Sequence, residues 1–414
     1  MNYVIFYYKI KRGGHFMKFN RYSFSFKTFY LVYLAAIGAF MPYVNTYLEK
    51  TCHLSGSQIG LITAISLVLG VCVIPLWGIA GDKTRKYNAL LQFSLAATLV
   101  VLYFYSKQTV YPMIVLCAIL LEVSRLGTMP MADTQATNYC HKTGGNYGSI
   151  RGLGSLGYML AGVAVGFIAD AFGLDGAMFA TYAVLLVVAF GISFLFPKYE
   201  TEEQNNENKE KKANVGEFKQ LIKNKKFLTC LSLTLLLPCV VDSAMNYGGN
   251  HLTVTLGGPA SSISLMTFCN VLPEVIFLMV ALKVINKTGF KKFYLFVAIM
   301  TCLRFGVYAF IPNQYAFLAA SVVHCLCVAI STVASLTFIR NTINPVVLGT
   351  AITLLNAAIN IGKAIWGYLF GIIYEIFGSF TMFGICLIPF VLAILIILKT
   401  DCFQEIDKNI GNIA

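Results

Sequence analysis

Residues 130–158 read PMADTQATNYCHKTGGNYGSIRGLGSLGY and hold an acid, Asp133, and a base, Arg151, eighteen positions apart in apolar surroundings. A charge at the depth of a bilayer costs at least ~2.5–3.5 kcal/mol, so such residues face a partner or a water-filled cavity and mark a solute pathway. We therefore predict that Asp133 and Arg151 lie on neighbouring membrane helices and face each other.

The composition predicts an integral membrane protein of the all-α class. Of the 414 residues, 57% are hydrophobic and 12% are charged, which leaves too little polar surface to cover a soluble domain of this size. The apolar runs are about 20 residues long, as expected for helices that cross a hydrocarbon core ~30 Å thick. A β-barrel would instead show a weaker alternation over about 10 residues.

Twelve apolar runs predict twelve transmembrane helices in two six-helix bundles. The expected spans are 29–48, 57–80, 88–105, 110–136, 147–169, 174–196, 227–249, 261–285, 292–311, 314–339, 346–372 and 377–398. A stretch rich in Lys and Glu separates the two sets of six runs. It has too few apolar residues to form a buried segment, so we expect it to be a linker. The expected division is a cytoplasmic segment 1–28, with Met17 as an alternative start, a bundle 29–197, a linker 198–226, a bundle 227–399 and a tail 400–414.

The distribution of charge predicts that both termini are cytoplasmic. A net charge of +13 in a soluble protein would point to nucleic acid, but most of the 31 Lys and Arg lie in alternate connections and the termini. Under the positive-inside rule these residues mark the cytoplasmic side, so we expect no nucleic-acid partner. The twelve Cys fall almost entirely within spans and form no CxxC motif, so we interpret them as packing residues.

Two stretches at corresponding places in the halves are alike. WGIAGDKTRKYNAL (77–90) follows the second span and ALKVINKTGFKKFYL (281–295) follows the eighth, and such internal repetition is typical of a two-bundle transporter. Any short cytoplasmic loop is basic, which explains the Lys and Arg but not Gly78 and Asp82. We therefore expect a gating motif in which Asp82 lies near the helix end and Arg85 reaches a neighbouring helix.

Charged and aromatic residues of the fourth and fifth spans predict one wall of a solute cavity. Glu122 and Arg125 are three residues apart and can pair on one helix face. The Arg151 guanidinium can hold the Asp133 carboxylate by two parallel bonds, either as a solute site or as a purely structural bridge. Tyr158 follows Arg151 by two turns and offers an aromatic face to the same cavity. The glycine-rich fifth span allows close helix approach.

Successive spans of the second half contain the titratable residues Asp242, Glu274, Arg304, His324 and Lys363. A lone buried His usually serves only as a hydrogen-bonding group, but charges of both signs in successive spans favour a shared polar network. A buried carboxylate in that network can bind a proton, and Glu274 is the first candidate, followed by Asp242. The sequence contains no motif for ATP hydrolysis, dinucleotide binding, metal coordination or a nucleophilic serine. We therefore expect no enzymatic activity and no cofactor, with a proton gradient as the driving force.

Together these features resemble the major facilitator superfamily, and more narrowly its branch of lactose and phenylpropionate permeases. The likeness runs from GAFMPYVNTYL in the first span to LFGIIYEIFG in the eleventh. Its most specific parts are the acid and Arg eighteen apart, NVLPEVIFLM around Glu274, and Arg304 followed twenty positions later by His324.

The resemblance implies roles for individual residues. Asp133 stands where the sugar permease has a sugar-binding Glu, Arg151 where it has the partnering Arg, and Tyr158 where it has the stacking Trp. Glu274 and His324 also fall on its functional positions. The resemblance therefore implies that these five residues contact the substrate.

Other positions of the resemblance concern proton coupling. Arg304 falls on a functional position and Asp242 on a charge-pair acid, whereas Cys327 replaces the principal proton-coupling Glu and Ser321 replaces a Lys. In this stretch the chain is more similar to the phenylpropionate permease, whose equivalent also reads His-Cys and lacks that acid. The resemblance thus implies proton coupling without implying galactoside recognition.

The leading hypothesis is a monomeric, proton-driven symporter of the bacterial cytoplasmic membrane that imports a small organic solute by alternating access. The solute is a saccharide, a nucleoside-like molecule or an aromatic carboxylate. Asp133 with Arg151 suits hydroxyl groups, whereas Arg151 with Arg304, His324 and Lys363 suits an anion. The surrounding lipid is the other expected partner.

Two alternatives remain beside this hypothesis. A proton-antiport exporter would carry a Gly-Pro motif in the fifth span, and residues 146–196 contain no Pro. A solute sensor without transport would need an output domain, for which the linker and tail are too short.

Overall fold

The computed structural model describes residues 21–143, 145–197, 224–343, 348–400 and 403. Most of the predicted linker 198–226, the alternative start at Met17 and most of the tail 400–414 lie outside these residues. The described residues form helices and no strands, which confirms the predicted all-α class.

Within the described residues, the first half of the chain folds into helices that match the six predicted spans. They are α1 (Arg21–Lys50), α2 (Gly56–Thr84), α3 (Tyr87–Tyr105), α4 (Tyr111–Arg125), α5 (Thr128–Thr143), α6 (Tyr147–Phe172) and α7 (Leu174–Ser193). α4 and α5 together form the fourth span. Pro130 lies in the first turn of α5, where a backbone N–H has no helical partner, so the interruption costs little.

The second half is more often interrupted. Its elements are α9 (Lys225–Leu236), α10 (Pro238–Met245), α11 (Gly248–Asn250), η1 (His251–Thr255), α12 (Ser261–Thr288), α13 (Phe290–Phe310), α14 (Gln314–Ser321), α15 (His324–Ala329), η2 (Ile330–Ala334), α16 (Ser335–Thr342), α17 (Leu348–Ile385) and α18 (Leu387–Lys399). α9 ends at Leu236, and Leu237 is not helical because proline disfavours the helical conformation of the residue before it. Gly378, at φ 78°, divides α17 between the eleventh and twelfth spans.

Ten stretches of the described residues are long and apolar enough to cross a membrane. One of them, Ala351–Lys399, is 49 residues long and holds most of the eleventh span and all of the twelfth. A shorter apolar stretch, Gln314–Ala329, belongs to the tenth span. All twelve predicted spans therefore correspond to helices.

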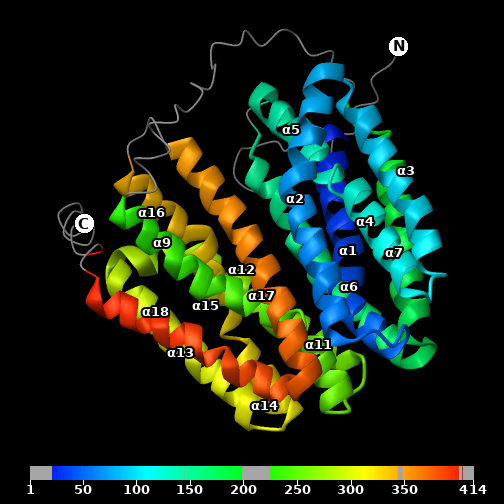
Figure 1. The fold of residues 1–414 in the computed structure, drawn as a ribbon. Coiled ribbons are helices and arrows are strands. Elements are labelled where there is room, and N and C mark those ends of the chain that lie inside the picture. The colour runs from blue at the N-terminus through cyan, green and yellow to red at the C-terminus, as the bar shows by residue number, and fades with distance from the viewer. Residues whose placement is uncertain (1–20, 144, 198–223, 344–347, 401–402, 404–414) are drawn as a thin grey trace, which may run out of the picture.

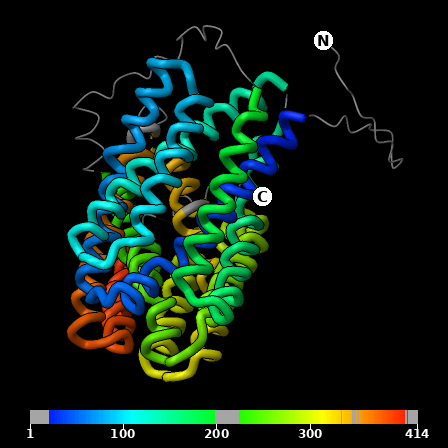
Figure 2. Tube along the Cα trace, turned by 90° about the vertical axis from the view of Figure 1, so that its right-hand side faces the viewer, coloured from blue at the N-terminus to red at the C-terminus, as the bar shows by residue number. Residues whose placement is uncertain are grey.

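The two halves form bundles that lie side by side (Figure 1), with their helices running along a common long axis (Figure 2). Lys83, Arg85, Lys142, Lys287 and Arg340 lie at or next to helix ends on one side, which the positive-inside rule makes the cytoplasmic end. We call the opposite end, where α1 ends and α2 and α12 begin, the outer end. The bundles diverge toward the cytoplasmic end and converge at the outer end (Figure 1).

Small residues let the two halves touch at the outer end. α2 and α17 meet at Gly56 and Gly371, and a Cβ added to Gly56 would lie 2.5 Å from the Gly371 carbonyl oxygen. A Cβ on Gly60 would lie 3.0 Å from the Gly367 carbonyl oxygen. Both helices thus present a Gly-x-x-x-Gly face, which permits close packing of membrane helices. α6 meets α12 in the same way through Gly166, whose Cβ would collide with an α12 side chain.

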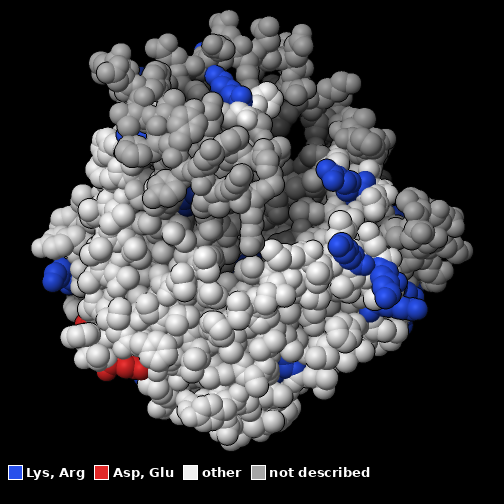
Figure 3. All heavy atoms as spheres, turned by 180° about the vertical axis from the view of Figure 1, so that it is seen from behind, with Lys and Arg blue, Asp and Glu red and all other residues white. Residues whose placement is uncertain are grey.

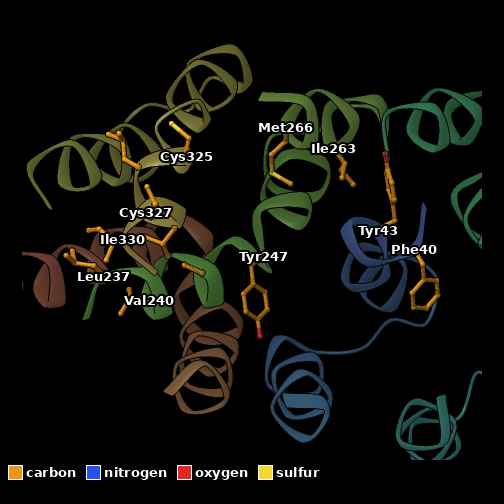
Figure 4. Packing of buried hydrophobic residues seen from close by; sticks show 14 of the residues in the cluster. Phe40, Tyr43, Leu237, Val240, Tyr247, Ile263, Met266, Cys325, Cys327 and Ile330 are labelled. Carbon is orange, nitrogen blue, oxygen red and sulfur yellow. The ribbon is translucent and has the colours of Figure 1, made fainter. Parts of the chain in front are cut away.

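Polar side chains join the halves at the same end. Glu49 of α1 accepts hydrogen bonds from Asn250 Nδ2 and from the Tyr374 hydroxyl, the latter at 2.9 Å. Tyr247 points toward α2 (Figure 4) and donates to the Gly56 carbonyl at 3.3 Å. Among the described residues, all hydrogen bonds between the halves lie in the outer part of the molecule. The protein is therefore closed at the outer end, in an inward-facing conformation.

Candidate functional site

A cavity of about 880 Å³ lies between the halves. Its polar lining consists of Asn45, Thr63, Ser66, Tyr105, Glu122, Tyr147, Arg151, Ser155 and Tyr158 from the first half, and Asp242, Asn246, Thr267, Asn270, Glu274 and His324 from the second. Because the halves are joined at the outer end, the cavity opens toward the cytoplasmic end. Most of the described surface in Figure 3 carries neither basic nor acidic side chains, as expected for a surface that faces lipid. Its volume is within the range of small-molecule sites, which is about 300–1,000 Å³.

Asp133 and Arg151 lie close to the same tyrosine ring but do not form the ion pair that the sequence predicts. Asp133 Oδ1 accepts hydrogen bonds from the hydroxyls of Tyr30, at 2.5 Å, and Tyr147, at 2.8 Å. The Arg151 guanidinium carbon lies 5.5 Å from the centre of the Tyr30 ring. Two hydroxyls thus satisfy the carboxylate, and the guanidinium is left facing the cavity. The expected direct ion pair of Asp133 and Arg151 is therefore wrong. Both residues instead contact Tyr30, Asp133 at its hydroxyl and Arg151 at its ring.

One face of α6 lines the cavity. Arg151, Ser155 and Tyr158 lie four and seven residues apart, a spacing that brings side chains to one side of a helix. The adjoining face packs on α1 through Gly154 and Gly157, whose Cβ atoms would collide with the α1 backbone or side chains. The predicted close approach of this span is therefore made against α1 as well as α12.

Glu122 and Arg125 form the ion pair that their spacing predicts. The Arg125 guanidinium donates to Glu122 Oε2 at 2.6 Å, and both side chains are largely buried. The two charges of this pair cancel each other at the wall of the cavity. Glu122 is therefore less available to a solute than an unpaired carboxylate would be.

The predicted network of the second half divides into separate parts. Lys363 pairs with Asp242 at 2.6 Å. Arg304, which is 1% exposed, donates from Nε to the Tyr308 hydroxyl at 2.7 Å, and its Nη1 lies 3.3 Å from His324 Nδ1. No hydrogen bond or ion pair joins these two groups within the described part of the chain. The expectation of one continuous network is thus corrected to two separate groups, one of Asp242 with Lys363 and one of Arg304 with Tyr308 and His324.

Glu274 is the carboxylate of this half that stays open. It lines the cavity and has no hydrogen-bond or ion-pair partner among the described residues. Asn270 lies one helical turn before it, also lines the cavity, and has a buried Oδ1 atom that the described residues leave without a partner. Sequence reasoning missed Asn270, although the four-residue spacing from Glu274 on one apolar helix was a usable signal.

Cys327 belongs to the packed interior of the second half and does not line the cavity. It is 1% exposed and lies beside Ile330, Leu237 and Val240 (Figure 4). Its sulfur is 3.2 Å from the Thr301 hydroxyl. This position therefore presents a buried thiol, and no carboxylate, to the interior of the second half.

The predicted gating motif lies at the cytoplasmic end of α2. Asp82 accepts a hydrogen bond from the Tyr87 hydroxyl, at the start of α3, at 2.7 Å. Arg85 ends α2 in a left-handed conformation with φ 53°, and its exposed side chain makes no bond to a neighbouring helix among the described residues. A Cβ on Gly78 would meet nothing, whereas one on Gly81 would lie 2.8 Å from the Tyr87 ring. The open cytoplasmic end leaves the expected Arg85 contact unmade.

Two charged side chains of the described lining, one cation and one anion, have no ion-pair partner. Glu122 and Asp242 are neutralised by Arg125 and Lys363, so the unpaired groups in the described lining are Arg151 and Glu274, on opposite halves. The described residues contain no group of three or more His, Cys, Asp or Glu that could hold a metal ion. The cavity therefore presents unpaired groups of both charge signs to a small solute.

A helical membrane protein with two bundles, a polar cavity between them and one closed end is a secondary transporter. The chain belongs to the MFS_1 like family, whose model matches residues 23–385.

Individual relatives extend over nearly the whole chain. The chain is 27% identical to the uncharacterized transporter YwbF of Bacillus subtilis (strain 168) over 383 residues, which cover 90% of this chain and 92% of YwbF. It is 28% identical to the maltose permease of Geobacillus stearothermophilus over 382 residues, covering 91% and 94%. The crystal structure of the nucleoside transporter NupG has a TM-score of 0.77 at 15% identity, covering 91% of this chain and 97% of NupG. These similarities support a transporter of small solutes rather than an enzyme.

Proposed function

We propose that this protein is a monomeric proton symporter of the bacterial cytoplasmic membrane that imports a small neutral hydroxylated solute, with a saccharide as the first candidate. The observation that carries the proposal is the presence of Arg151 and Glu274, unpaired within the described residues, on opposite walls of one cavity. A neutral solute leaves their opposite charges balanced. An anion would face the uncompensated Glu274 carboxylate.

Each open group suits a part of a sugar. Glu274 and Asn270 Oδ1 accept hydrogen bonds from hydroxyls, and the Arg151 guanidinium donates to hydroxyl or ring oxygens. Tyr158 lines the same space and offers an apolar ring face. The similarity to a maltose permease supports this solute class.

A nucleoside is the second candidate, because its base can lie on the Tyr158 ring while its ribose hydroxyls meet Glu274. The fold likeness to NupG is compatible with it. An aromatic carboxylate is disfavoured by the open Glu274. Within the family, we infer that the mechanism is nearest to the lactose and phenylpropionate permease branch, because His324 is followed by Cys327 and the remaining acids must take the coupling role.

The ligand class is tested by a thermal-shift screen of the purified protein against maltose, uridine and phenylpropionate. A ligand that binds the folded state alone raises the melting temperature, by an amount equivalent to about 2.7 kcal/mol at a concentration of 100 Kd. We expect a shift with maltose that is absent in Arg151→Ala. A shift with phenylpropionate and none with the neutral compounds would contradict the proposal.

Proton coupling is tested with Glu274→Gln in proteoliposomes. The variant cannot exchange a proton at this position, so we expect it to retain solute exchange at equal pH on both sides and to lose accumulation driven by a pH gradient. Asp175→Asn is the matched control, because Asp175 is exposed in the first turn of α7 and away from the cavity. Unchanged accumulation by Glu274→Gln would move the coupling role to Asp133 or Asp242.

A further inference from the structure

Two short motifs end corresponding helices of the two halves. Asp170-Ala-Phe-Gly173 ends α6, the fifth span, and Glu375-Ile-Phe-Gly378 ends the eleventh span in α17. Gly173 has φ 88° and Gly378 has φ 78°, a conformation that glycine adopts without steric cost. Each glycine therefore stops its helix three residues after a carboxylate, at the outer end.

The Asp170 carboxylate reaches the other half. Its Oδ1 accepts a hydrogen bond from the Ala260 backbone N–H at 2.7 Å, and its Oδ2 accepts one from Ser261 N–H at 3.2 Å. Ser261 is the first residue of α12, and the residue before it provides no side-chain cap. The N-terminus of α12 in the second half is thus capped by an acid of the first half.

The Glu375 carboxylate makes the reciprocal contact. Its Oε2 accepts a hydrogen bond from the backbone N–H of Ser57, the second residue of α2, at 2.9 Å. α2 and α12 are the second and eighth spans, which correspond to each other in the repeat of the two halves. The two carboxylates therefore make the same kind of bond in opposite directions across the interface.

The physical basis of both contacts is the same. The first N–H groups of a helix have no partner within the helix, and the helix dipole adds a partial positive charge at that end. A carboxylate from the opposite half satisfies these groups only while the halves touch. When the outer end opens, water must replace both contacts.

We propose that Asp170 and Glu375 are a symmetric pair of latches that position the two halves in the inward-facing conformation and that break when the transporter opens outward. The inference uses the alternating access of the proposed function. Neither residue lines the solute cavity, so the latches set the balance between conformations without contacting the solute.

The test measures how often the outer end opens. A reporter cysteine, Ser155→Cys, is placed on the cavity wall, and Cys52, which is partly exposed near the outer end, is replaced by serine. Intact cells are treated with a membrane-impermeant maleimide, and the same chain without the reporter supplies the background. The labelling rate then reports the fraction of molecules that are open to the outside.

We expect Asp170→Ala and Glu375→Ala each to raise the labelling rate about tenfold, which corresponds to about 1.4 kcal/mol. The double variant should raise it about 100-fold, because the free-energy changes of mutations at distant sites add. Labelling in inside-out vesicles reports the inward-open fraction, which should fall by the fraction that the outward-open form gains. Asp175→Ala removes an exposed acid near the same end that makes no hydrogen bond to the other half among the described residues, so it should leave both rates unchanged.

Should the alanine variants fail to reach the membrane, Asp170→Asn and Glu375→Gln keep an acceptor oxygen and lose the charge, and we expect a smaller change in the same direction. Unchanged labelling of the inserted double variant overturns the proposal, and so does an equal change in Asp175→Ala. The assay needs neither solute nor proton gradient. A wrong solute class would therefore leave this result intact, and failed latches would leave the ligand screen intact.

Discussion

Replacing Arg151 with alanine is expected to lower solute uptake by about 10- to 100-fold while leaving membrane insertion intact. The guanidinium lines the cavity and, within the described residues, contacts the Tyr30 ring but no carboxylate. Hydrogen bonds to a charged group contribute about 1.5–3 kcal/mol, and about 2.8 kcal/mol corresponds to a factor of 100. No ion pair is broken by the substitution, so the folded protein should tolerate it.

The measurement is the initial rate of uptake of radiolabelled maltose, normalised to the amount of inserted protein. Arg151→Lys keeps the charge but loses the planar fork of donors, and we expect an intermediate rate. Ser149→Ala, an exposed change on the same helix, serves as the matched control. Normal uptake by inserted Arg151→Ala would remove this residue from the site.

Replacing Asp242 alone with alanine is expected to destabilise the protein by about 2 kcal/mol. Lys363 would then keep a charge inside the membrane without its partner at 2.6 Å. Breaking a fully buried pair costs about 3–5 kcal/mol, and the smaller value allows for the exposed fractions of the two side chains, 27% for Lys363 and 31% for Asp242. The double variant with Lys363→Ala removes both charges and should recover most of the loss.

The check is a double-mutant cycle on the melting temperature of the detergent-purified protein. We expect both single variants to melt lower than the double variant, which is the sign of a coupled pair. Independent, additive losses would mean that the ion pair contributes nothing beyond its separate side chains. Glu274, and not Asp242 or Lys363, is the first candidate for proton coupling. Uptake by the double variant therefore shows whether the loss in the single variants comes from lower stability or from lost coupling.

The inward-facing conformation connects the site with the closed outer end. The cavity presents Arg151 and Glu274 to the cytoplasmic side, while Glu49, Asp170 and Glu375 hold the outer end shut. Closing the cytoplasmic end would bring the exposed Arg85 toward the other half. The predicted gate and the latches thus belong to opposite ends of one conformational change.

Local patterns in the sequence predicted the elements well. The span expected at 147–169 is α6, Tyr147–Phe172, because the thickness of a bilayer imposes the length of an apolar run. The pair of Glu122 and Arg125 was also predictable, since three-residue spacing on one helix brings side chains together whatever surrounds them.

Contacts between helices were not predictable in the same way. Asp133 was expected to meet Arg151, yet it meets Tyr30, which lies 103 residues away and whose aromatic ring carries no distinctive sequence signal. Lys363 was expected in a shared network, yet it pairs with Asp242 alone. Such pairings depend on how far each helix is rotated about its axis, which the spacing along one chain does not encode.

By itself, the sequence determined the membrane class and the twelve spans, because hydropathy and helical period are local properties. Only the tertiary structure decided which charges neutralise one another, that Arg151 and Glu274 stay open, and that Asp170 and Glu375 close the outer end. These outcomes depend on helices far apart in the chain meeting at particular crossings, where the lack of a side chain on glycine and the exposed N–H groups of helix ends select the contact.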